Sequence, residues 1–394
     1  MGLASLDRWK ASLIHLGISV AIGASAAGAR PLSSPVPVPA GVPPPAIGAP
    51  AYLLIDYAGS QGIVGDDADA RREPASLTKL MTAYLVFAAL RDKTITAAQM
   101  VPVSDAAWRV EGSRMFIEPR KAVSVDELLH GLIVQSGNDA AIALAELLAG
   151  SESAFAERMN AEAARLGLAN THFVNPTGLS NPQQYSTAAD LAQLAAAIIR
   201  DFPEFYPLYS LREYRYNNIT QPNRNRLLWI DPYVDGMKTG HTDAAGWCLI
   251  ASARRGDRRL LAVVLGDASD AARTSDAQKL LNYGFQAYDT VQLYSAGKAV
   301  SDLRVWKGES REVAAGFFTD QYLALPKGKA EKLALSLIAV EPLVAPVLKG
   351  QRLGTVRVSL EGKQMAEFPL VALDDVPIAN IFKRAWDTIR LWFQ

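Results

Sequence analysis

Residues 76–79 of this chain are Ser76-Leu77-Thr78-Lys79, and two further motifs follow, Ser136-Gly137-Asn138 and Lys238-Thr239-Gly240. In the first motif the serine and lysine are three residues apart, so on a helix they share a face and can hydrogen-bond. Pro74 precedes them, at a position where helices often begin. A second Ser-x-x-Lys, residues 295–298, lies after the other two motifs, and we interpret it as accidental. The ordered triple predicts one site assembled from distant segments.

A serine hydroxyl is a poor nucleophile until a base removes its proton. Lys79 can be that base only if its pKa falls from ~10.4 to nearer ~7, which is on the order of 4–5 kcal/mol. The positive end of a helix supplies only ~0.3–1 kcal/mol of this. Burial and a second cation must supply the rest, and Lys238 is the cation that we expect.

The remaining motif residues meet the other demands of acyl transfer. Ser136 can relay a proton to a leaving amine, and Asn138 can hold Lys79 through its oxygen and a substrate amide through its nitrogen. Lys238 and Thr239 offer a charge and a hydroxyl to a terminal carboxylate. Gly240 allows a substrate backbone to lie close along the strand, and main-chain N–H groups can stabilise an oxyanion.

Composition excludes several other classes of function. The 394 residues suffice for two domains, and Lys+Arg and Asp+Glu number 40 each, so no overall basic field indicates nucleic acid. Cys248 is the single cysteine, in an apolar setting typical of a buried thiol. None of the four histidines lies in a metal-binding pattern. We therefore expect no metal and no cofactor.

The N-terminal segment predicts export. Residues 1–29 combine a positively charged start, a short apolar run and small residues, which indicates a signal peptide cleaved after Ala26 or Ala29. The alternative is an uncleaved anchor helix, for which the apolar run is short. Residues 30–49 contain seven prolines among small residues and predict an extended linker.

The rest of the chain divides into three parts. Residues 50–292 mix helical and strand patterns, residues 293–375 form a predicted small all-β domain, and residues 376–394 a terminal helix. Periodicity predicts helices over 76–91, 126–148 (interrupted at 136–138), 153–166, 188–200 and 276–288, and strands over 51–56, 246–253, 259–266, 333–340 and 354–360. No internal repeat is visible.

The terminal stretch 377–394 is strongly amphipathic. Its apolar face includes Trp386 and Trp392, and most charges on the opposite face are basic. This pattern predicts a helix that lies on a membrane surface, here the outer face of the inner membrane. The alternative is a helix docked on its own domain.

These features together resemble the low-molecular-mass penicillin-binding D-alanyl-D-alanine carboxypeptidases, serine enzymes that β-lactam antibiotics acylate. Besides the three motifs, the resemblance rests on residues 133–140, 185–191, 223–225 and 234–242. It is close over residues 50–290 and looser beyond them. It implies an α/β (α+β) fold of the penicillin-recognising transpeptidase/β-lactamase type: an antiparallel sheet flanked by helices, with Lys238-Thr239-Gly240 on its edge strand.

The resemblance also implies roles. Ser76 would attack the penultimate carbonyl of a peptidoglycan stem peptide ending in D-Ala-D-Ala, and water would hydrolyse the acyl-enzyme. The main-chain amides of Ser76 and His241 would form the oxyanion hole, and Arg273 would help to bind the terminal carboxylate. Thr177 stands where some members have a histidine, so the resemblance carries over no histidine side-chain role in deacylation or pH dependence.

Three other functions are compatible with part of the pattern. A class A β-lactamase shares two motifs, but this chain has no Glu-x-x-Leu-Asn between Ser136 and Lys238, and Gly137 stands where those enzymes usually have aspartate. An endopeptidase that cleaves cross-links has the same motifs. A catalytically inactive wall-binding protein would not need every chemical group of the site.

Overall fold

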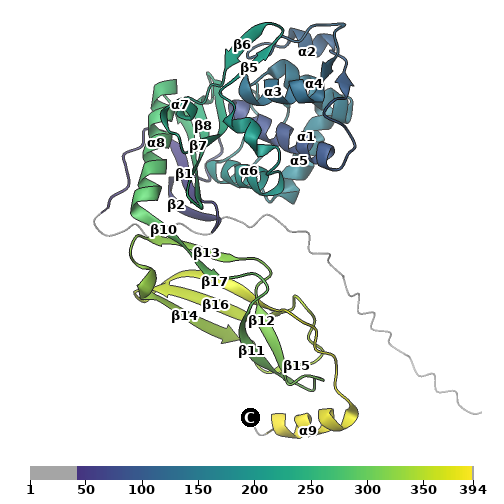
Figure 1. The fold of residues 1–394 in the computed structure, drawn as a ribbon, viewed down its shortest axis with the longest axis vertical. Coiled ribbons are helices and arrows are strands. Elements are labelled where there is room, and N and C mark those ends of the chain that lie inside the picture. Colours follow the sequence, from purple (N-terminus) through teal and green to yellow (C-terminus); the bar gives the residue numbers. More distant parts are fainter. Residues whose placement is uncertain (1–41, 393–394) are drawn as a thin grey trace, which may run out of the picture.

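Five antiparallel strands form the central sheet of the N-terminal part of the molecule (Figure 1). Their order is β2 (Gln61–Asp66), β1 (Ala51–Asp56), β9 (Arg258–Asp267), β8 (Gly246–Arg255) and β7 (Val234–Thr242). The middle strands are apolar without alternation because helices cover both faces of the sheet. β7 is an edge strand, as the resemblance implied.

One face of the sheet packs on α8 (Asp270–Ala287), and the other faces a helical region. That region contains η1 (Ala75–Thr78), α1 (Lys79–Arg91), α2 (Asp105–Arg109), α3 (Val125–Val134), α4 (Asn138–Ala149), α5 (Glu152–Arg165) and α6 (Ala188–Asp201). Short elements complete it: β3 (Met100–Val101), β4 (Val123–Ser124), η2 (Tyr206–Ser210), β5 (Glu213–Tyr216) and β6 (Ile219–Pro222). The short helix α7 (Leu227–Ile230) instead lies on the α8 side of the sheet, where Leu227 and Leu228 share a core cluster with Leu280 of α8.

Side-chain caps fix where several helices begin. Ser124 and Glu127 form a reciprocal capping box at α3, and Thr187 caps α6. Ser269 caps α8 by accepting a hydrogen bond from Ala272 N at 3.1 Å. Because of this cap, α8 begins at Asp270 rather than at the predicted residue 276, and the added turn contains Arg273.

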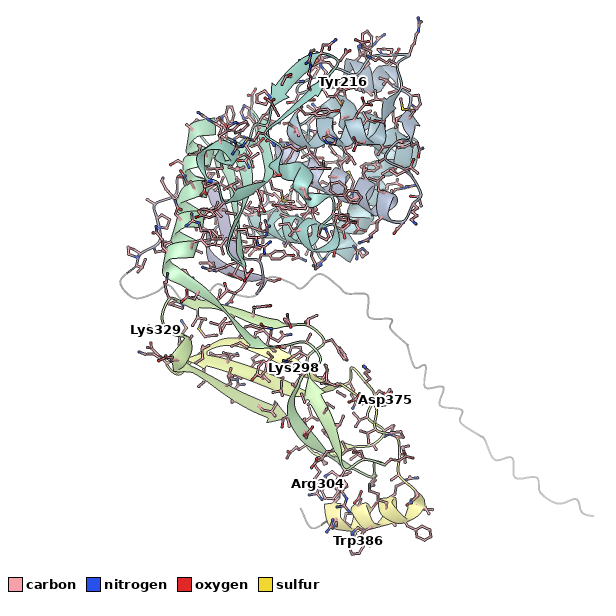
Figure 2. All side chains as sticks on the ribbon, viewed as in Figure 1. Tyr216, Lys298, Arg304, Lys329, Asp375 and Trp386 are labelled. Atoms are coloured by element: carbon pink, nitrogen blue, oxygen red, sulfur yellow. The ribbon has the colours of Figure 1, made fainter. Side chains whose placement is uncertain are left out.

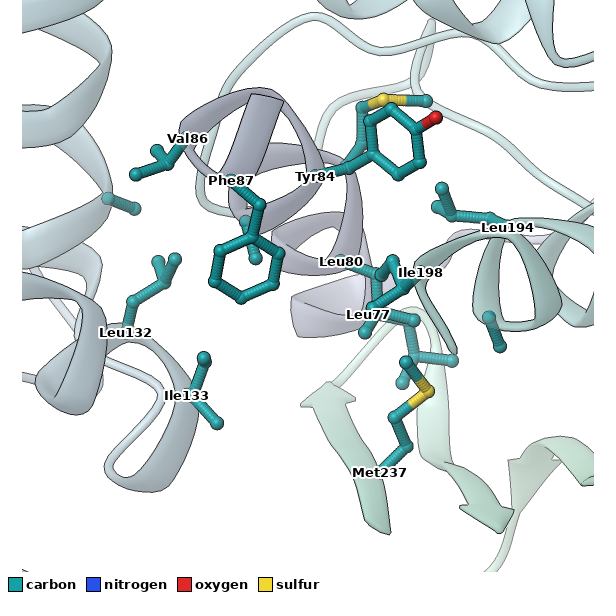
Figure 3. Close-up of a cluster of buried hydrophobic side chains, with 14 of the residues drawn as sticks. Leu77, Leu80, Tyr84, Val86, Phe87, Leu132, Ile133, Leu194, Ile198 and Met237 are labelled. Carbon is teal, nitrogen blue, oxygen red and sulfur yellow. The ribbon is translucent and has the colours of Figure 1, made fainter. Parts of the chain in front are cut away.

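The largest core cluster lies between the sheet and the helices. Figure 3 shows α1 at its centre, packed against α3, α6 and β7. Its buried side chains include Leu77, Leu80, Tyr84, Phe87, Leu132, Ile133, Leu194, Ile198 and Met237. Burying a leucine or phenylalanine side chain contributes about 1.5–3 kcal/mol, so this core fixes the end of α1 from which Lys79 projects.

The second part of the molecule is all-β, as predicted. Six strands are ordered β14 (Leu333–Ala339), β16 (Arg352–Leu360), β17 (Lys363–Ala372), β12 (Glu312–Gly316), β11 (Ala299–Trp306) and β15 (Leu343–Val344). β10 (Tyr288–Tyr294) and β13 (Gln321–Pro326) form a separate pair, and η3 (Ala330–Lys332) precedes β14. A hairpin turn at residues 361–362 joins β16 to β17.

Polar contacts join the two parts. Asp56, at the end of β1, is fully buried and accepts hydrogen bonds from Arg258 Nε at 3.1 Å and from the Thr290 hydroxyl of β10. Gln61 Oε1 accepts a hydrogen bond from Ala324 N of β13 at 2.9 Å. The pair β10–β13 therefore lies directly against the edge of the larger domain.

The chain ends in helix α9 (Ile381–Leu391), at the end of the molecule opposite the larger domain (Figure 1). Its polar side faces the β-rich domain, since Asp387 accepts from Lys307 N at 2.8 Å and Lys383 Nζ donates to Glu309 O at 2.9 Å. Its apolar side chains Ile381, Phe382, Trp386 and Ile389 are 52–83% exposed. A helix docked on its own domain would bury its apolar side there. Here the polar side contacts the domain and the apolar side is exposed.

The structure describes residues 42–392. The predicted signal peptide and the first part of the predicted linker lie outside the described residues. The end of that linker lies along α8, where Tyr283 Oη donates to Val42 O at 3.2 Å and Gly48 N donates to Asp276. No helix in this range is both long and apolar enough to cross a membrane.

Candidate active site

Ser76 lies in the 3-10 turn η1, and Lys79 is the first residue of α1. Lys79 Nζ is 2.9 Å from Ser76 Oγ, so the two groups share a face as the spacing predicted. Ala75, the residue before Ser76, has a φ of 47°. Gly178 lies against the Ala75 carbonyl so closely that a Cβ at residue 178 would overlap it. The glycine therefore allows a second segment to hold the serine turn in place.

Lys79 is buried, with 1% of its surface exposed. Its amine also contacts two oxygen acceptors: Asn138 Oδ1 at 2.7 Å and the main-chain oxygen of Thr177 at 2.5 Å. Both acceptors take N–H hydrogens, which leaves the third direction of the amine toward Ser76 Oγ. A protonated amine donates in all three directions, whereas a neutral amine donates to Asn138 and Thr177 and turns its lone pair to the Ser76 hydroxyl.

The pKa of Lys79 is lowered to about 7, first by burial and then by the positive charge of Arg224; the charge of Asp139 opposes the shift. The sequence predicted a second cation but expected Lys238. The pKa of Lys238 is itself strongly lowered, first by burial and then by the charges of Lys79, Arg224 and Arg273.

The turn between α3 and α4 supplies the second motif. Ser136 has a φ of 60°, an uncommon conformation for a residue with a side chain. Its Oγ accepts a hydrogen bond from Lys238 Nζ at 2.8 Å. Lys238 also donates to Thr239 O at 3.0 Å. The turn and the edge strand are therefore joined inside the site by a buried lysine.

Gly240 brings strand β7 close to the serine turn. A Cβ at this residue would lie 3.1 Å from Ala75 Cβ, from Pro74 O and from Ser76 N. The sequence assigned Gly240 to close approach of a substrate; the structure adds close approach of the protein backbone itself. It also places residues 240–241 beside the main-chain amide of Ser76.

A cavity of about 310 Å³ opens over these residues. It is lined by Ser76, Gly112, Ser113, Ser136, Arg224, Thr239, Gly240, His241, Trp247 and Arg273. The His241 ring stacks on Trp247 with centroids 3.9 Å apart. Arg273 donates to Gly240 O at 2.9 Å and to Cys248 O at 3.1 Å, and pairs with Asp270. The cavity thus brings the Ser76 hydroxyl together with two arginines, Arg224 and Arg273.

Sequence reasoning missed three contributions to the site. The sequence pattern includes Arg224 in the family-like segment 223–225 but predicts no role for it. The Thr177 carbonyl accepts a hydrogen bond from Lys79 Nζ. The Glu111 carbonyl accepts one from Asn138 Nδ2 at 2.6 Å. Main-chain acceptors leave no signature in residue identity. A larger cavity, about 610 Å³, lies between the domains beside Tyr57 and Tyr322 and contains none of the motif residues.

Comparison with known proteins agrees with this geometry. Residues 39–269 match the D-alanyl-D-alanine carboxypeptidase family, and residues 288–377 match the C-terminal domain of penicillin-binding protein 5. The chain is 43% identical to the D-alanyl-D-alanine carboxypeptidase DacC of Escherichia coli, over 89% of each chain. It is 43% identical to DacA of Haemophilus influenzae, over 89% of this chain and 91% of that one.

Solved structures extend the likeness to both domains. Penicillin-binding protein 5 of Haemophilus influenzae superposes with a TM-score of 0.83 at 42% identity, covering 86% of this chain and all of that chain. Penicillin-binding protein 6B of Escherichia coli gives 0.71 at 40% identity, covering 85% and 99%. The chain therefore belongs to the D-alanyl-D-alanine carboxypeptidase family, and it is a serine-type enzyme of the penicillin-binding protein class.

Proposed function

We propose that Ser76 is the acyl-ester nucleophile and Lys79 the general base of this carboxypeptidase. The observation that supports this most is the environment of Lys79: a buried amine with a pKa of about 7, two oxygen acceptors for its hydrogens, and Ser76 Oγ at 2.9 Å. A base with a pKa near the working pH is both unprotonated and able to accept a proton.

The reaction then proceeds in two steps. Ser76 Oγ attacks the carbonyl of the penultimate D-alanine while its proton passes to Lys79. The amides of Ser76 and His241 stabilise the oxyanion. Ser136, held by Lys238, relays a proton to the leaving amine, the C–N bond breaks, and free D-alanine departs. Water then hydrolyses the ester, which releases the shortened peptide and restores the serine. A β-lactam enters by the same attack on its ring amide.

The terminal carboxylate of the substrate binds in the same cavity as Ser76. Lys238, Thr239 and Arg273 were expected there, and Arg224 lines the same cavity. Burial and the neighbouring cation Arg273 lower the pKa of Arg224. An arriving carboxylate relieves this repulsion between cations, so the cavity favours peptides with a free C-terminus over internal peptide bonds.

Two assays test these roles. Wild-type protein incubated with a pentapeptide ending in D-Ala-D-Ala should yield tetrapeptide and free D-alanine. It should also be labelled covalently by a fluorescent penicillin, and Ser76→Ala should abolish both. Labelling that survives Ser76→Ala would show that another residue is the nucleophile. Ser295→Ala is the matched control, because Lys298 of that second motif lies in the β-rich domain (Figure 2).

We also propose that the enzyme works outside the cytoplasm, peripheral to the outer face of the inner membrane, with residues 1–29 removed as a signal peptide. In this proposal residues 30–49 are a linker, 50–292 the peptidase domain, 293–375 the β-rich domain and 376–394 the membrane-surface helix. The outward apolar side of α9, which includes Trp386, supports the last assignment (Figure 2).

Deletion of residues 377–394 should release the mature protein from membranes into the soluble fraction. The deletion should leave labelling by penicillin intact, because α9 lies at the end of the molecule opposite the larger domain, which contains Ser76 (Figure 1). Trp229→Ala, which removes an exposed tryptophan of the peptidase domain, is the control. Continued sedimentation of the truncated protein with membranes would contradict the proposal.

A further inference from the structure

We propose that Asp139, the residue after the second motif, is a positioning residue: it fixes the segment 110–117 that forms one wall of the cavity and orients Asn138. This inference rests on the proposed roles of Ser76 and Lys79. It concerns a residue that lies outside the cavity and touches no substrate, so its effect must pass through the residues that it holds.

The Asp139 carboxylate is a concentrated acceptor for main-chain amides. Oδ1 accepts from Met115 N at 3.0 Å, and Oδ2 accepts from Phe116 N at 2.8 Å and from Ile117 N at 3.2 Å. Oδ1 also accepts from Ala140 N, in its own helix, at 2.9 Å. The residue is 1% exposed. A buried carboxylate is stabilised only where donors solvate it, and here three consecutive amides of one segment do so.

The same segment is joined to residue 138 on its other side. Ser113 O accepts from Asn138 N at 2.7 Å, and Glu111 O accepts from Asn138 Nδ2 at 2.6 Å. Gly112 and Ser113, between these contacts, line the cavity. The start of α4 thus holds the segment through Asn138 and Asp139. Because the Glu111 carbonyl accepts from the Asn138 side-chain nitrogen, the side-chain oxygen of Asn138 is directed at Lys79 Nζ.

The backbone at Phe116 shows that this segment needs to be held. Its φ is 69°, in the left-handed region that residues with side chains avoid. The Phe116 side chain is 40% exposed, so its burial does not account for the conformation. Met115, which is buried against Gly131, contributes packing on one side. The hydrogen bond from Phe116 N to Asp139 is the direct restraint on the strained residue.

Gly137 fits this arrangement. A Cβ at residue 137 would lie 2.7 Å from Asp139 Oδ1 and 3.3 Å from Met115 N. A side chain in the middle of the second motif would therefore push the carboxylate and the segment apart. The glycine that distinguishes this chain from Ser-Asp-Asn enzymes is explained by the aspartate that follows Asn138.

Asp139 also acts on Lys79 through its charge. Three ionisable groups interact with this amine: Arg224 from the segment before α7, Lys238 from β7, and Asp139 from α4. Of these, Arg224 and Asp139 shift the pKa of Lys79. Asp139 raises the pKa of Lys79, whereas burial and Arg224 lower it. Loss of the Asp139 charge should therefore lower the pKa of Lys79 further. A residue with only a structural role would not produce this change.

The test is Asp139→Asn, which keeps the size of the side chain but turns an amide toward the segment. We expect the second-order rate constant for acylation by a fluorescent penicillin to fall by about 10- to 100-fold, as for a displaced catalytic group. KM for the pentapeptide should rise, and the acid limb of the acylation pH profile should move to lower pH. Residual labelling would remain at Ser76, whereas Ser76→Ala abolishes labelling, so failure of the two proposals can be distinguished.

Asp276→Asn is the matched control. Asp276 is also buried and accepts from two consecutive amides, Gly48 N at 2.5 Å and Ala49 N at 3.2 Å, but on α8. It should lose stability with an unchanged pH profile. If Asp139→Asn behaves in the same way, with acylation per folded molecule at the wild-type rate, the proposal is wrong.

A measurement on the unmodified enzyme covers the case in which Asp139→Asn does not fold. Hydrogen exchange at the amides of residues 115–117 should be as slow as in the interior of α4, although the segment is a loop and the Phe116 side chain is exposed. Exchange at the rate of a free loop would show that the carboxylate does not restrain the segment, and would overturn the proposal.

Discussion

At the residue scale, the pKa of Lys79 determines how the rate of acylation depends on pH. Only the unprotonated amine can accept the Ser76 proton, so with a pKa of about 7 acylation should rise with pH and level off above neutrality. At pH 6 the rate should be about one tenth of its plateau. Stopped-flow acylation by a chromogenic cephalosporin over pH 5–9 measures this limb; a rate constant that does not change through pH 6–8 would exclude Lys79 as the base.

Substitutions of Arg224 test whether the acid limb of the pH profile follows the pKa of Lys79. Its positive charge lowers the pKa of Lys79, so Arg224→Gln should raise that pKa and move the acid limb to higher pH. Arg224→Lys keeps the charge and should leave the limb in place, although both variants bind a carboxylate less well. A limb that moves equally in both variants, or in neither, would show that the charge of Arg224 does not act on Lys79.

Residue identity predicted part of this site and not the rest. Ser76, Lys79, Asn138 and Lys238 were predicted to lie together because their order and spacing reproduce a chemical pattern. The structure brings them together, and their catalytic roles stay a prediction. Arg224 was not predicted as the second cation, since a lone arginine in sequence is indistinguishable from a solvated one. The Thr177 carbonyl was not predicted because every residue has a carbonyl and only the fold directs one at an amine.

At the scale of elements, strand β7 and turn η1 are joined through Gly240. A methyl group at this residue would lie 3.1 Å from two backbone atoms, Pro74 O and Ser76 N, which cannot move without the nucleophile. Gly240→Ala should therefore cost about 1–3 kcal/mol of stability. It should reduce acylation by on the order of tenfold or more.

Gly59→Ala is the control for this prediction, because its added Cβ would meet only ordinary contacts, the nearest at 3.4 Å. Rates from fluorescent-penicillin labelling, normalised to folded protein, separate the two effects. Wild-type acylation in Gly240→Ala would mean that β7 yields without displacing Ser76.

The boundaries of helices and strands were predicted correctly only where nearby residues specify them. The strand over residues 51–56 and the break at 136–138 were predicted because apolar patterning and a glycine specify them locally. The start of α8 was predicted too late, since its first turn is polar and only the Ser269 cap marks it. That turn places Arg273 in the cavity, so the error concerned an element of the site.

At the scale of the whole molecule, the two domains should unfold together because buried polar groups couple them. The fully buried Asp56 binds both Arg258 of its own domain and the Thr290 hydroxyl of β10, the connecting strand that pairs with β13 of the β-rich domain. Thr290→Val keeps the shape and removes the hydroxyl, so it should cost about 1–3 kcal/mol. Asp56→Ala leaves Arg258 without its carboxylate and should cost more, about 3–5 kcal/mol.

The distribution of this loss distinguishes coupling from simple destabilisation. If Thr290 joins the domains, calorimetry of Thr290→Val should show the unfolding transitions of the β-rich and peptidase domains moving apart. Penicillin acylation should stay at the wild-type rate, because Thr290 does not line the cavity that contains Ser76. Thr94→Val, which removes an exposed hydroxyl bound to Ala89 O within the helical region, should leave the transitions together. Coincident transitions in Thr290→Val at the wild-type temperature would mean that apolar contacts, such as those of Ala324 with the core beside α8, join the domains without this hydrogen bond.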